Sequence, residues 1–409
     1  MTGATGGAAS SGAADAAAGG AGAGDAAAGG AGAAANGTSP RPRRVVVLGG
    51  GVIGVSTATH LARAGARVEL VTAGALADGA SGRSLSWLNS AGARSLEYHE
   101  LRMAGVDRYR TLFAADPTRE WLRFDGGLHW QAAGLADAER ARHTAETRHG
   151  YDSHLLAADE VPGAVHGIRP GAVPEVAIRN PGEGWVSLPH LIEHLAAELR
   201  ALGGAITTDA GVCAVRVEGG RAVGVVTAAG ERIDGDAVVV ACGASTPGVV
   251  EPLGATIPDG SPWSMLVTTE PSAARLRSVV NSPRVAIRPS PGGAYALDHA
   301  WYEHDIRVVD GEPTIDERVV HELVDEANAV VEGGTLRAAS WRLGRKPVPG
   351  DGEPVLGELA SAPGAYAAFT HSGATLALIA GELIAHELLT GERHPMLATF
   401  RPERFAAAG

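Results

Sequence analysis

Residues 44–54 read Arg-Val-Val-Val-Leu-Gly-Gly-Gly-Val-Ile-Gly, an apolar run that enters a glycine cluster and leads into a helical pattern and a second strand at 66–72. Gly49, Gly51 and Gly54 have G-x-G-x-x-G spacing. In a strand–turn–helix unit, the first glycine permits a tight turn, the second lets the backbone approach a pyrophosphate, and the third lets the helix pack closely on the strand. A pyrophosphate would lie on the N–H groups at the positive end of the helix. The pattern therefore predicts a dinucleotide site.

Length, charge and cysteine content narrow the class of protein. The chain has 409 residues, enough for two domains or one large interleaved unit, and its net charge of −12 argues against a nucleic-acid partner. No apolar run approaches the roughly 18–20 residues of a membrane span. Cys213 and Cys242 are too few for a disulfide framework, so we expect buried free thiols and a cytoplasmic protein.

Residues 1–40 are mostly Ala and Gly. Such a segment buries too little apolar surface to offset the entropy lost on ordering. It also lacks the positive start and leucine-rich core of a secretory signal. We predict a disordered tail here and exclude it from the fold.

The rest of the chain alternates helical and strand patterns. A nearly continuous apolar strand at 236–243 is typical of a strand buried on both sheet faces, so the chain is expected to return there to the first sheet. Further patterns predict helices at 95–115, 136–149, 188–202 and after 371–373, strands at 212–217 and 222–227, and a separate sheet within 262–309. We expect an α/β nucleotide-binding domain built from several chain segments, with an α+β domain inserted.

Four motifs in this order resemble one family. They are the glycine-rich start at 45–58, Ala-Ser-Gly-Arg-Ser at 80–84, Asp-Ala-Val-Val-Val-Ala-Cys-Gly-Ala at 236–244, and Gly-Arg-Lys-Pro-Val-Pro-Gly-Asp-Gly-Glu-Pro-Val-Leu-Gly at 344–357 followed by Thr-His-Ser-Gly-Ala-Thr-Leu at 370–376. Over about 44–405 the chain is similar to the flavin-dependent amine and amino-acid oxidoreductases related to D-amino-acid oxidase, glycine oxidase and sarcosine oxidase.

The resemblance implies a Rossmann-like FAD-binding domain and an inserted α+β substrate domain that contains an antiparallel sheet. The FAD-binding domain is expected at 41–95, 180–250 and 336–405, and the substrate domain at 96–179 and 251–335. The implied cofactor-binding residues are Gly49, Gly51, Val52, Ile53, Gly54, Thr72, Ser81, Gly82, Arg83, Ser84, Val212, Ala241, Cys242, Gly243, His371, Ser372, Gly373, Ala374, Thr375 and Leu376.

The chemistry of two of these positions leads to more specific expectations. Family members usually carry an acid at the end of the second strand to bind the adenosine ribose, and here that position is Thr72, while Glu69 faces the other way. A helix that begins near Ala374 would direct its N–H groups at the negative edge of a reduced flavin. The alternative is that His371-Ser372-Gly373 is a helix-start turn with a capping serine.

The chemistry implied is hydride transfer from the carbon that bears an amine to flavin N5, which gives an imine. Lys346, the single lysine of the chain, stands where the family commonly has the arginine that binds the substrate carboxylate, with Arg345 beside it. The alternative is a basic pair facing solvent at a strand edge. Weaker substrate-site hypotheses concern Tyr98, Arg102 and Tyr295. Trp87 and Asn89 could approach the flavin face, but as core residues they would need no functional explanation.

The leading hypothesis is thus an FAD-dependent oxidoreductase acting on a D-amino, glycine-like or N-alkyl amino acid or another small amine, with oxygen as acceptor. Three alternatives stay open. Electrons could pass to a quinone or carrier, the chain could be a nicotinamide-dependent dehydrogenase using the first fold alone, or it could be a catalytically idle FAD-binding subunit. No histidine or cysteine spacing suggests a metal site.

Overall fold

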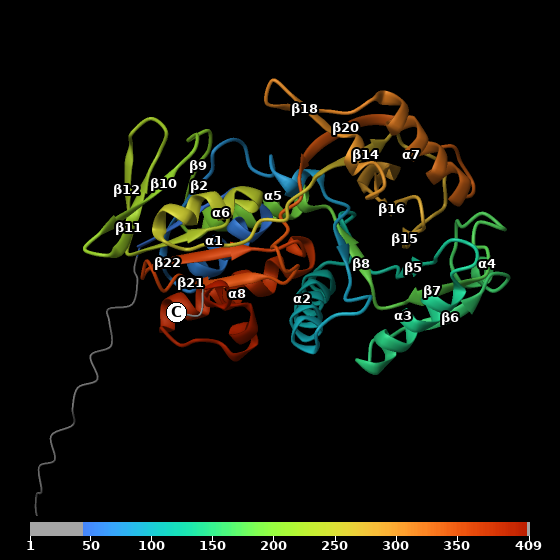
Figure 1. Cartoon of the computed structure of the whole chain (residues 1–409), viewed down its shortest axis with the longest axis horizontal. Coiled ribbons are helices and arrows are strands. Elements are labelled where there is room, and N and C mark those ends of the chain that lie inside the picture. The colour runs from blue at the N-terminus through green and yellow to red at the C-terminus, as the bar shows by residue number, and fades with distance from the viewer. Residues whose placement is uncertain (1–43, 407–409) are drawn as a thin grey trace, which may run out of the picture. The chain divides into compact units, whose positions relative to one another are not determined.

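The computed structural model describes residues 44–406. The predicted disordered tail at 1–40 lies outside the described residues. Within them, the fold is built on two large sheets, which Figure 1 shows in separate parts of the molecule.

The first sheet has six strands in the order β21-β22-β13-β1-β2-β9, and all neighbours are parallel except the β21–β22 pair. Its central strand β1 is buried at Val45–Leu48, as its apolar sequence predicts. The strands are β1 (Arg44–Leu48), β2 (Arg67–Val71), β9 (Ala205–Thr207), β13 (Ala237–Val240), β21 (Val355–Glu358) and β22 (Ala365–Phe369). The 236–243 segment therefore does return to the first sheet, directly beside β1.

Alternate residues of β1 face two different cores. Val45 and Val47 pack with the helices α1 (Val52–Arg63), α2 (Leu96–Ala115), α5 (Leu188–Ala201) and α8 (Gly373–Thr390). Val46 and Leu48 pack on the other side, against α6 (Thr246–Val250) and the small sheet of β10 (Ala214–Glu218), β11 (Arg221–Val226) and β12 (Arg232–Asp234). Burial on both faces explains why the strands read as unbroken apolar runs.

The second sheet has eight strands in the order β20-β14-β17-β16-β15-β5-β7-β6. The helices α7 (Glu317–Val330) and α4 (Val161–Ala164) contribute to the core on one of its faces. Its strands are β5 (Gly127–His129), β6 (His154–Ala157), β7 (Val176–Asn180), β14 (Trp263–Thr269), β15 (Val279–Asn281), β16 (Ala286–Pro289), β17 (Tyr295–Asp298) and β20 (Ala338–Arg345).

Smaller elements complete the described chain. They are the helix α3 (Ala136–Arg148), the three-stranded sheet of β3 (Trp87–Leu88), β8 (Gly184–Val186) and β4 (Leu122–Arg123), the hairpin of β18 (Arg307–Val309) and β19 (Glu312–Thr314), and the short 3-10 helices at 80–83, 243–245, 251–253, 291–293, 303–305, 395–400 and 402–405.

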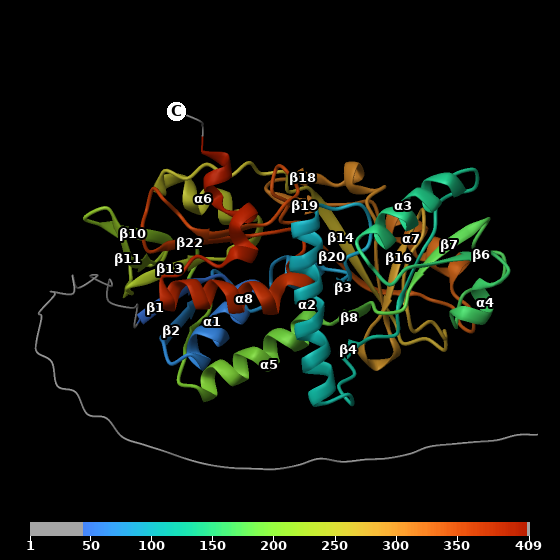
Figure 2. The same ribbon diagram turned by 90° about the horizontal axis from the view of Figure 1, so that it is seen from below.

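Two elements pack in a different part of the molecule from the domain predicted for them. Strand β20, expected in the FAD-binding part, pairs along its length with β14 of the eight-stranded sheet. Helix α2, expected in the substrate part, packs in the first core, where it crosses the start of α8 (Figure 2). Sequence pattern reveals the type of an element but not the surface on which its apolar face packs.

Helix α8 corrects the expectation that no apolar run reaches the length of a membrane span. It has 18 residues with a mean hydropathy of 1.3, which is long and apolar enough to cross a membrane. However, 67% of these residues are buried inside the protein, where they pack against α1 and α2. Burial on nearly all sides accounts for the composition of this helix.

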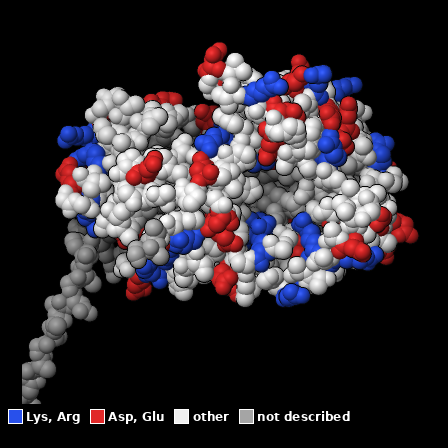
Figure 3. Space-filling view, in the orientation of Figure 1, with Lys and Arg blue, Asp and Glu red and all other residues white. Residues whose placement is uncertain are grey.

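Charged side chains of both signs are interspersed on the face shown in Figure 3, which is hollowed between the two parts of the molecule. That face offers no broad basic surface for a polyanion.

Candidate functional site

The glycine turn after β1 has the geometry that its sequence predicts. Gly49 has a φ of +116°, and a Cβ atom there would lie 2.2 Å from the carbonyl oxygen of Ala241 on the neighbouring strand end. A Cβ at Gly54 would lie 2.0 Å from the carbonyl oxygen of Gly49, so α1 packs directly on the turn. Both positions require glycine because no side-chain carbon fits.

The start of α1 is open to a ligand. The N–H of Val52 donates to Ser81 Oγ at 3.0 Å, and no hydrogen bond among the described residues takes up the N–H groups of Gly51 and Ile53. These residues line a cavity of about 1030 Å³ that begins at this turn. Unpaired N–H groups at a helix N-terminus suit a phosphate.

Most of the predicted cofactor-binding residues meet in this one cavity. Residues that line it are Gly49, Gly51, Val52, Ile53, Thr72, Ser81, Arg83, Ser84, Val212, Ala241, Cys242, Gly243, His371, Ser372, Gly373, Ala374 and Thr375. The exceptions are Gly54, Gly82 and Leu376, which lie behind the wall. A Cβ at Gly82 would lie 2.3 Å from the Ala77 carbonyl oxygen, and Leu376 is fully buried in the first core.

The adenosine end follows the register expected from the sequence. Thr72 lines the cavity just after β2, whereas Glu69 points elsewhere, and its Oε1 accepts a hydrogen bond from Thr207 Oγ1 at 3.2 Å. Val212 lines the same region with 81% of its surface exposed, so its side chain is available to contact a flat ring.

The far end of the cavity is closed by the start of α8. Gly373, Ala374 and Thr375 line the cavity. Their backbone N–H groups donate to no acceptor among the described residues. Ser372 precedes the helix but makes no capping hydrogen bond, since its Oγ contacts the Tyr98 hydroxyl and Arg102 Nη1. The interpretation of Ser372 as a simple helix cap is therefore wrong.

Arg102 and Tyr98 hold this helix start from α2. Arg102 is buried, lines the cavity, and donates from Nε to the Asn89 carbonyl oxygen at 2.8 Å and from Nη2 to Asn89 Oδ1 at 2.9 Å. Tyr98 is buried behind Ser372 and does not reach the cavity surface. Its predicted substrate role is not supported by its position, because Ser372 stands between it and the space.

Lys346 reaches the cavity but is already paired. Its Nζ lies 2.9 Å from Glu303 Oε1 and 3.3 Å from Asp298 Oδ2. Burial lowers the pKa of Lys346, and the attraction of Asp298 and Glu303 outweighs burial, so that the pKa is raised overall. Lys346 is therefore charged, and its ammonium is already paired with two carboxylates; its role as the substrate-carboxylate anchor stays a prediction.

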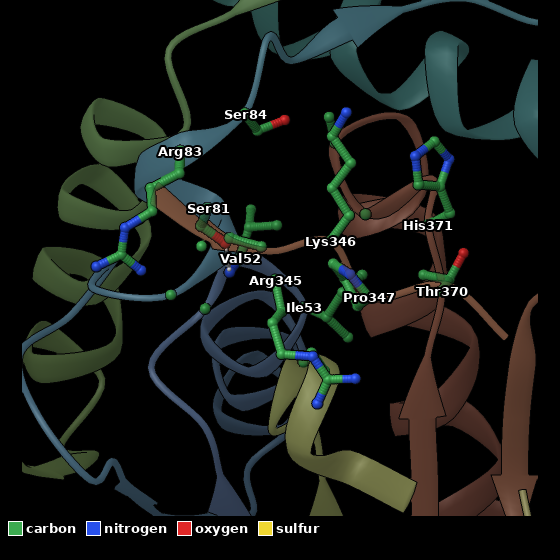
Figure 4. Close-up of a pocket in the computed structure, with 18 of the residues that line it drawn as sticks. Val52, Ile53, Ser81, Arg83, Ser84, Arg345, Lys346, Pro347, Thr370 and His371 are labelled. Carbon is green, nitrogen blue, oxygen red and sulfur yellow. Dashed lines mark hydrogen bonds between the residues drawn. The ribbon is translucent and has the colours of Figure 1, made fainter. Parts of the chain in front are cut away.

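Two other residues predicted for the substrate site, Arg345 and Tyr295, do not point into the same part of the cavity as Lys346. Figure 4 shows the side chains of Arg345 and Lys346 pointing in opposite directions, as expected for successive residues of an extended chain. Arg345 donates from Nη2 to Asp259 Oδ2 at 2.7 Å. Tyr295 lies outside the cavity: it is buried in the second core, and its hydroxyl donates to the carbonyl oxygens of Ala274 and Leu276 at 2.9 and 3.1 Å.

His371 lies beside Lys346 in Figure 4. It is exposed to the cavity but surrounded by protein, and this burial, together with the positive charges of Lys346, Arg102 and Arg94, lowers its pKa to about 4. His371 is therefore uncharged near neutral pH, and the cations that act on it must be grouped at this end of the cavity.

Several contributors to the wall were not predicted from the sequence, and three of them come from distant segments. Arg94 precedes α2, Asp298 ends β17, and Gly311-Glu312-Pro313 belong to the β18–β19 hairpin. No motif marks them, because they come from segments whose patterns indicate only a strand end, a turn or a loop. Trp87 and Asn89, for which a place near the flavin was predicted, also line the cavity.

The model of the family described as DAO, FAD dependent oxidoreductase, matches residues 44–387. This chain belongs to the DAO family of FAD-dependent oxidoreductases. Among curated relatives, a D-amino acid dehydrogenase of Methylobacterium nodulans is 29% identical over 424 residues, covering 87% of this chain and 97% of that protein. A glycine oxidase of Pseudomonas aeruginosa is 29% identical over 381 residues, covering 90% of this chain and 99% of that protein.

Solved structures confirm the fold. Glycine oxidase from Bacillus cereus superposes with a TM-score of 0.73 at 21% identity, covering 88% of this chain and 98% of that one. L-amino acid deaminase from Proteus myxofaciens gives a TM-score of 0.75 at 19% identity, covering 90% and 95%. The predicted α/β class and the family resemblance are thus both confirmed.

The cavity fits the cofactor of this family. The unpaired N–H groups of Gly51 and Ile53 would hold the pyrophosphate, and those at the start of α8 would lie at the flavin edge. Between them Ser81, Ala241 and Cys242 line the wall. FAD thus has donors at both ends of the cavity, from two helices that are distant in sequence.

Neither cysteine is set up for reaction. Both are free, and burial, reinforced by Cys213, raises the pKa of Cys242 to about 12. A protonated thiol is a poor nucleophile. No cluster of His, Cys, Asp or Glu within residues 44–406 could hold a metal ion.

Proposed function

We propose that the protein oxidises the C–N bond of a small amino acid or N-alkyl amino acid. The substrate carbon loses a hydride and its nitrogen a proton, and the resulting imine is hydrolysed by water. The relatives described above are called a D-amino acid dehydrogenase and a glycine oxidase, and both names refer to amino acids. FAD, when bound, supplies the two-electron acceptor.

The observation that carries this proposal is the charge at the His371 end of the cavity. Arg94, Arg102 and Lys346 all line that end, and of these only Lys346 has a carboxylate within ion-pair distance among the described residues. Such a site favours a substrate that brings its own negative charge. The chain's part in the chemistry is to hold that charge and orient the carbon beside it.

An anaerobic reduction experiment tests the proposal. The FAD-loaded protein is mixed with D-amino, L-amino and N-methyl amino acids and with the corresponding amines that lack a carboxylate. We expect at least one amino acid to bleach the visible flavin absorbance, and its carboxylate-free amine to do so far more slowly. Failure of every amino acid to reduce the bound flavin would contradict the proposal and favour an FAD-binding subunit without activity.

The electron acceptor and the cellular location are further proposals. Both an oxidase and a dehydrogenase occur among the relatives, so oxygen or a carrier could reoxidise the flavin. Stoichiometric hydrogen peroxide during turnover in air would identify oxygen, whereas turnover with a quinone and no peroxide would identify a carrier. The two free cysteines support the cytoplasm as the location.

A further inference from the structure

The cavity is lined by six basic side chains, and five of them are already engaged by a polar side chain of the protein. Arg83 lies 3.4 Å from Asp78, Arg142 3.0 Å from Glu146, Arg345 2.7 Å from Asp259 and Lys346 2.9 Å from Glu303, while Arg102 is held by Asn89 and Ser372. The remaining one is Arg94.

Arg94 is positioned by its backbone environment and not by an acid. Its Nε donates to the carbonyl oxygen of Ala91 at 3.1 Å, and its guanidinium lies over the Tyr98 ring at 5.4 Å from the ring centre. No hydrogen bond or ion pair within residues 44–406 uses Nη1 or Nη2 of Arg94. The nearby carboxylate of Glu353 accepts a hydrogen bond from Ser95 instead. Two N–H-bearing nitrogens of a fixed guanidinium are therefore free at the cavity wall.

The electrostatic surroundings of Arg94 are unfavourable without an anion. Burial lowers the pKa of Arg94 to about 10, with a further contribution from the positive charge of Arg102. The positive charge of Arg142 lowers the pKa of Arg94 further. A bound carboxylate would relieve this repulsion and supply the missing partner.

We propose that Arg94, and not Lys346, binds the substrate carboxylate. Its two free nitrogens match the two oxygens of a carboxylate in a bidentate pair, which orients the substrate better than a lysine point charge does. Lys346 instead forms ion pairs with Asp298 and Glu303 and is part of the cavity wall. This assignment rests on the proposed function and names the feature that would select acidic substrates over simple amines.

The test compares Arg94→Met with Arg110→Met in the FAD-loaded enzyme. Arg110 is a matched control on α2: it also donates to a backbone carbonyl, that of Gly182 at 2.7 Å, and lies over an aromatic ring, that of Phe124 at 5.7 Å, but it is outside the cavity. We expect Arg94→Met to raise KM for the best amino acid at least about thirtyfold and to leave KM for its carboxylate-free amine nearly unchanged. Arg110→Met should change neither value.

A binding measurement and a second variant test the role of Arg94 independently of turnover. Propionate, an amino acid analogue without the amine, should perturb the flavin spectrum of the wild type and bind far more weakly to Arg94→Met. If that variant does not fold, Arg94→Lys replaces it, with an intermediate KM expected. Wild-type KM values and unchanged propionate binding in a folded Arg94 variant would overturn the assignment. A wild-type enzyme that no amino acid reduces would instead refute the proposed function.

Discussion

Thr72 shows how a single residue sets cofactor affinity. It lines the cavity just after β2 and offers one neutral hydroxyl where an acid could accept charge-assisted hydrogen bonds from ribose hydroxyls. We expect Thr72→Glu to bind FAD about fivefold more tightly, since a charge-assisted hydrogen bond contributes roughly 1 kcal/mol more than a neutral one. Fluorescence titration of the apoprotein with FAD measures this. Glu69→Gln, on the opposite side of the strand, should leave affinity unchanged, and equal or weaker binding by Thr72→Glu would count against the register.

Glu183 predicts a pH-dependent stability. Burial raises its pKa from 4.5 to about 8, and its Oε1 accepts a hydrogen bond from the Tyr151 hydroxyl at 2.6 Å. Between these pH values the folded protein holds a proton that the unfolded chain has released, so stability falls as the pH rises through that range. Within this range, the free energy of unfolding falls by up to about 1.4 kcal/mol for each pH unit.

Replacing Glu183 with Gln removes this titration while keeping an oxygen for Tyr151. We therefore expect the Tm of Glu183→Gln, measured relative to the wild type, to increase between pH 5.5 and pH 8. Parallel Tm curves for the two proteins across that range would show that Glu183 is ionised in the folded state.

At the scale of elements, the crossing of α2 and α8 depends on one glycine. A Cβ at Gly105 would lie 2.3 Å from the carbonyl oxygen of Thr375, in the first turn of α8. We expect Gly105→Ala to lower stability by about 1–3 kcal/mol, because the strain of overpacking exceeds the roughly 1 kcal/mol gain in helix propensity. Denaturant unfolding measures the change.

The same substitution should weaken FAD binding, because Thr375 lines the cavity. Gly163→Ala is the matched control, since Gly163 is also helical and nothing lies within 4 Å of its added Cβ. A Gly105→Ala protein as stable as the control would mean that the helices separate at no cost.

Helices and strands with strong periodicity could be predicted before the structure was known. Helix α5 spans Leu188–Ala201 against an expected 188–202, and α2 spans Leu96–Ala115 against 95–115. Their apolar spacing and end signals are local, so the sequence carries them. The partner of an element is not local. Strand β20 pairs with β14, whose residues lie 69 to 82 positions earlier in the chain, and no pattern in either strand predicts this pairing.

At the scale of the molecule, the cavity joins parts of both sheets. Gly49 follows β1 of the six-stranded sheet, whereas Trp263 and Lys346 come from β14 and the end of β20 in the eight-stranded sheet. A cofactor that fills the cavity therefore contacts both parts. We expect FAD present at about 100 times its Kd to stabilise the protein by about 2.7 kcal/mol over the apoprotein.

This ligand effect is measured by thermal unfolding with and without added FAD, with FMN as the control ligand because it lacks the adenosine that Thr72 and Val212 would contact. An equal rise in Tm with FMN would show that the adenosine end of the cavity adds nothing to binding.

The sequence by itself determined the strand–turn–helix that would receive a pyrophosphate, the family, and the residues of the glycine turn and of the α8 start that line the two ends of the cavity. These depend on backbone geometry that only certain residues permit, such as Gly49 at its positive φ. Only the tertiary structure decided which charges remain free. Lys346 is balanced by Asp298 and Glu303 because β14 lies between β20 and β17, while Arg94 has no carboxylate within ion-pair distance among the described residues. Charge balance depends on distances between segments far apart in the chain, and local pattern does not encode those distances.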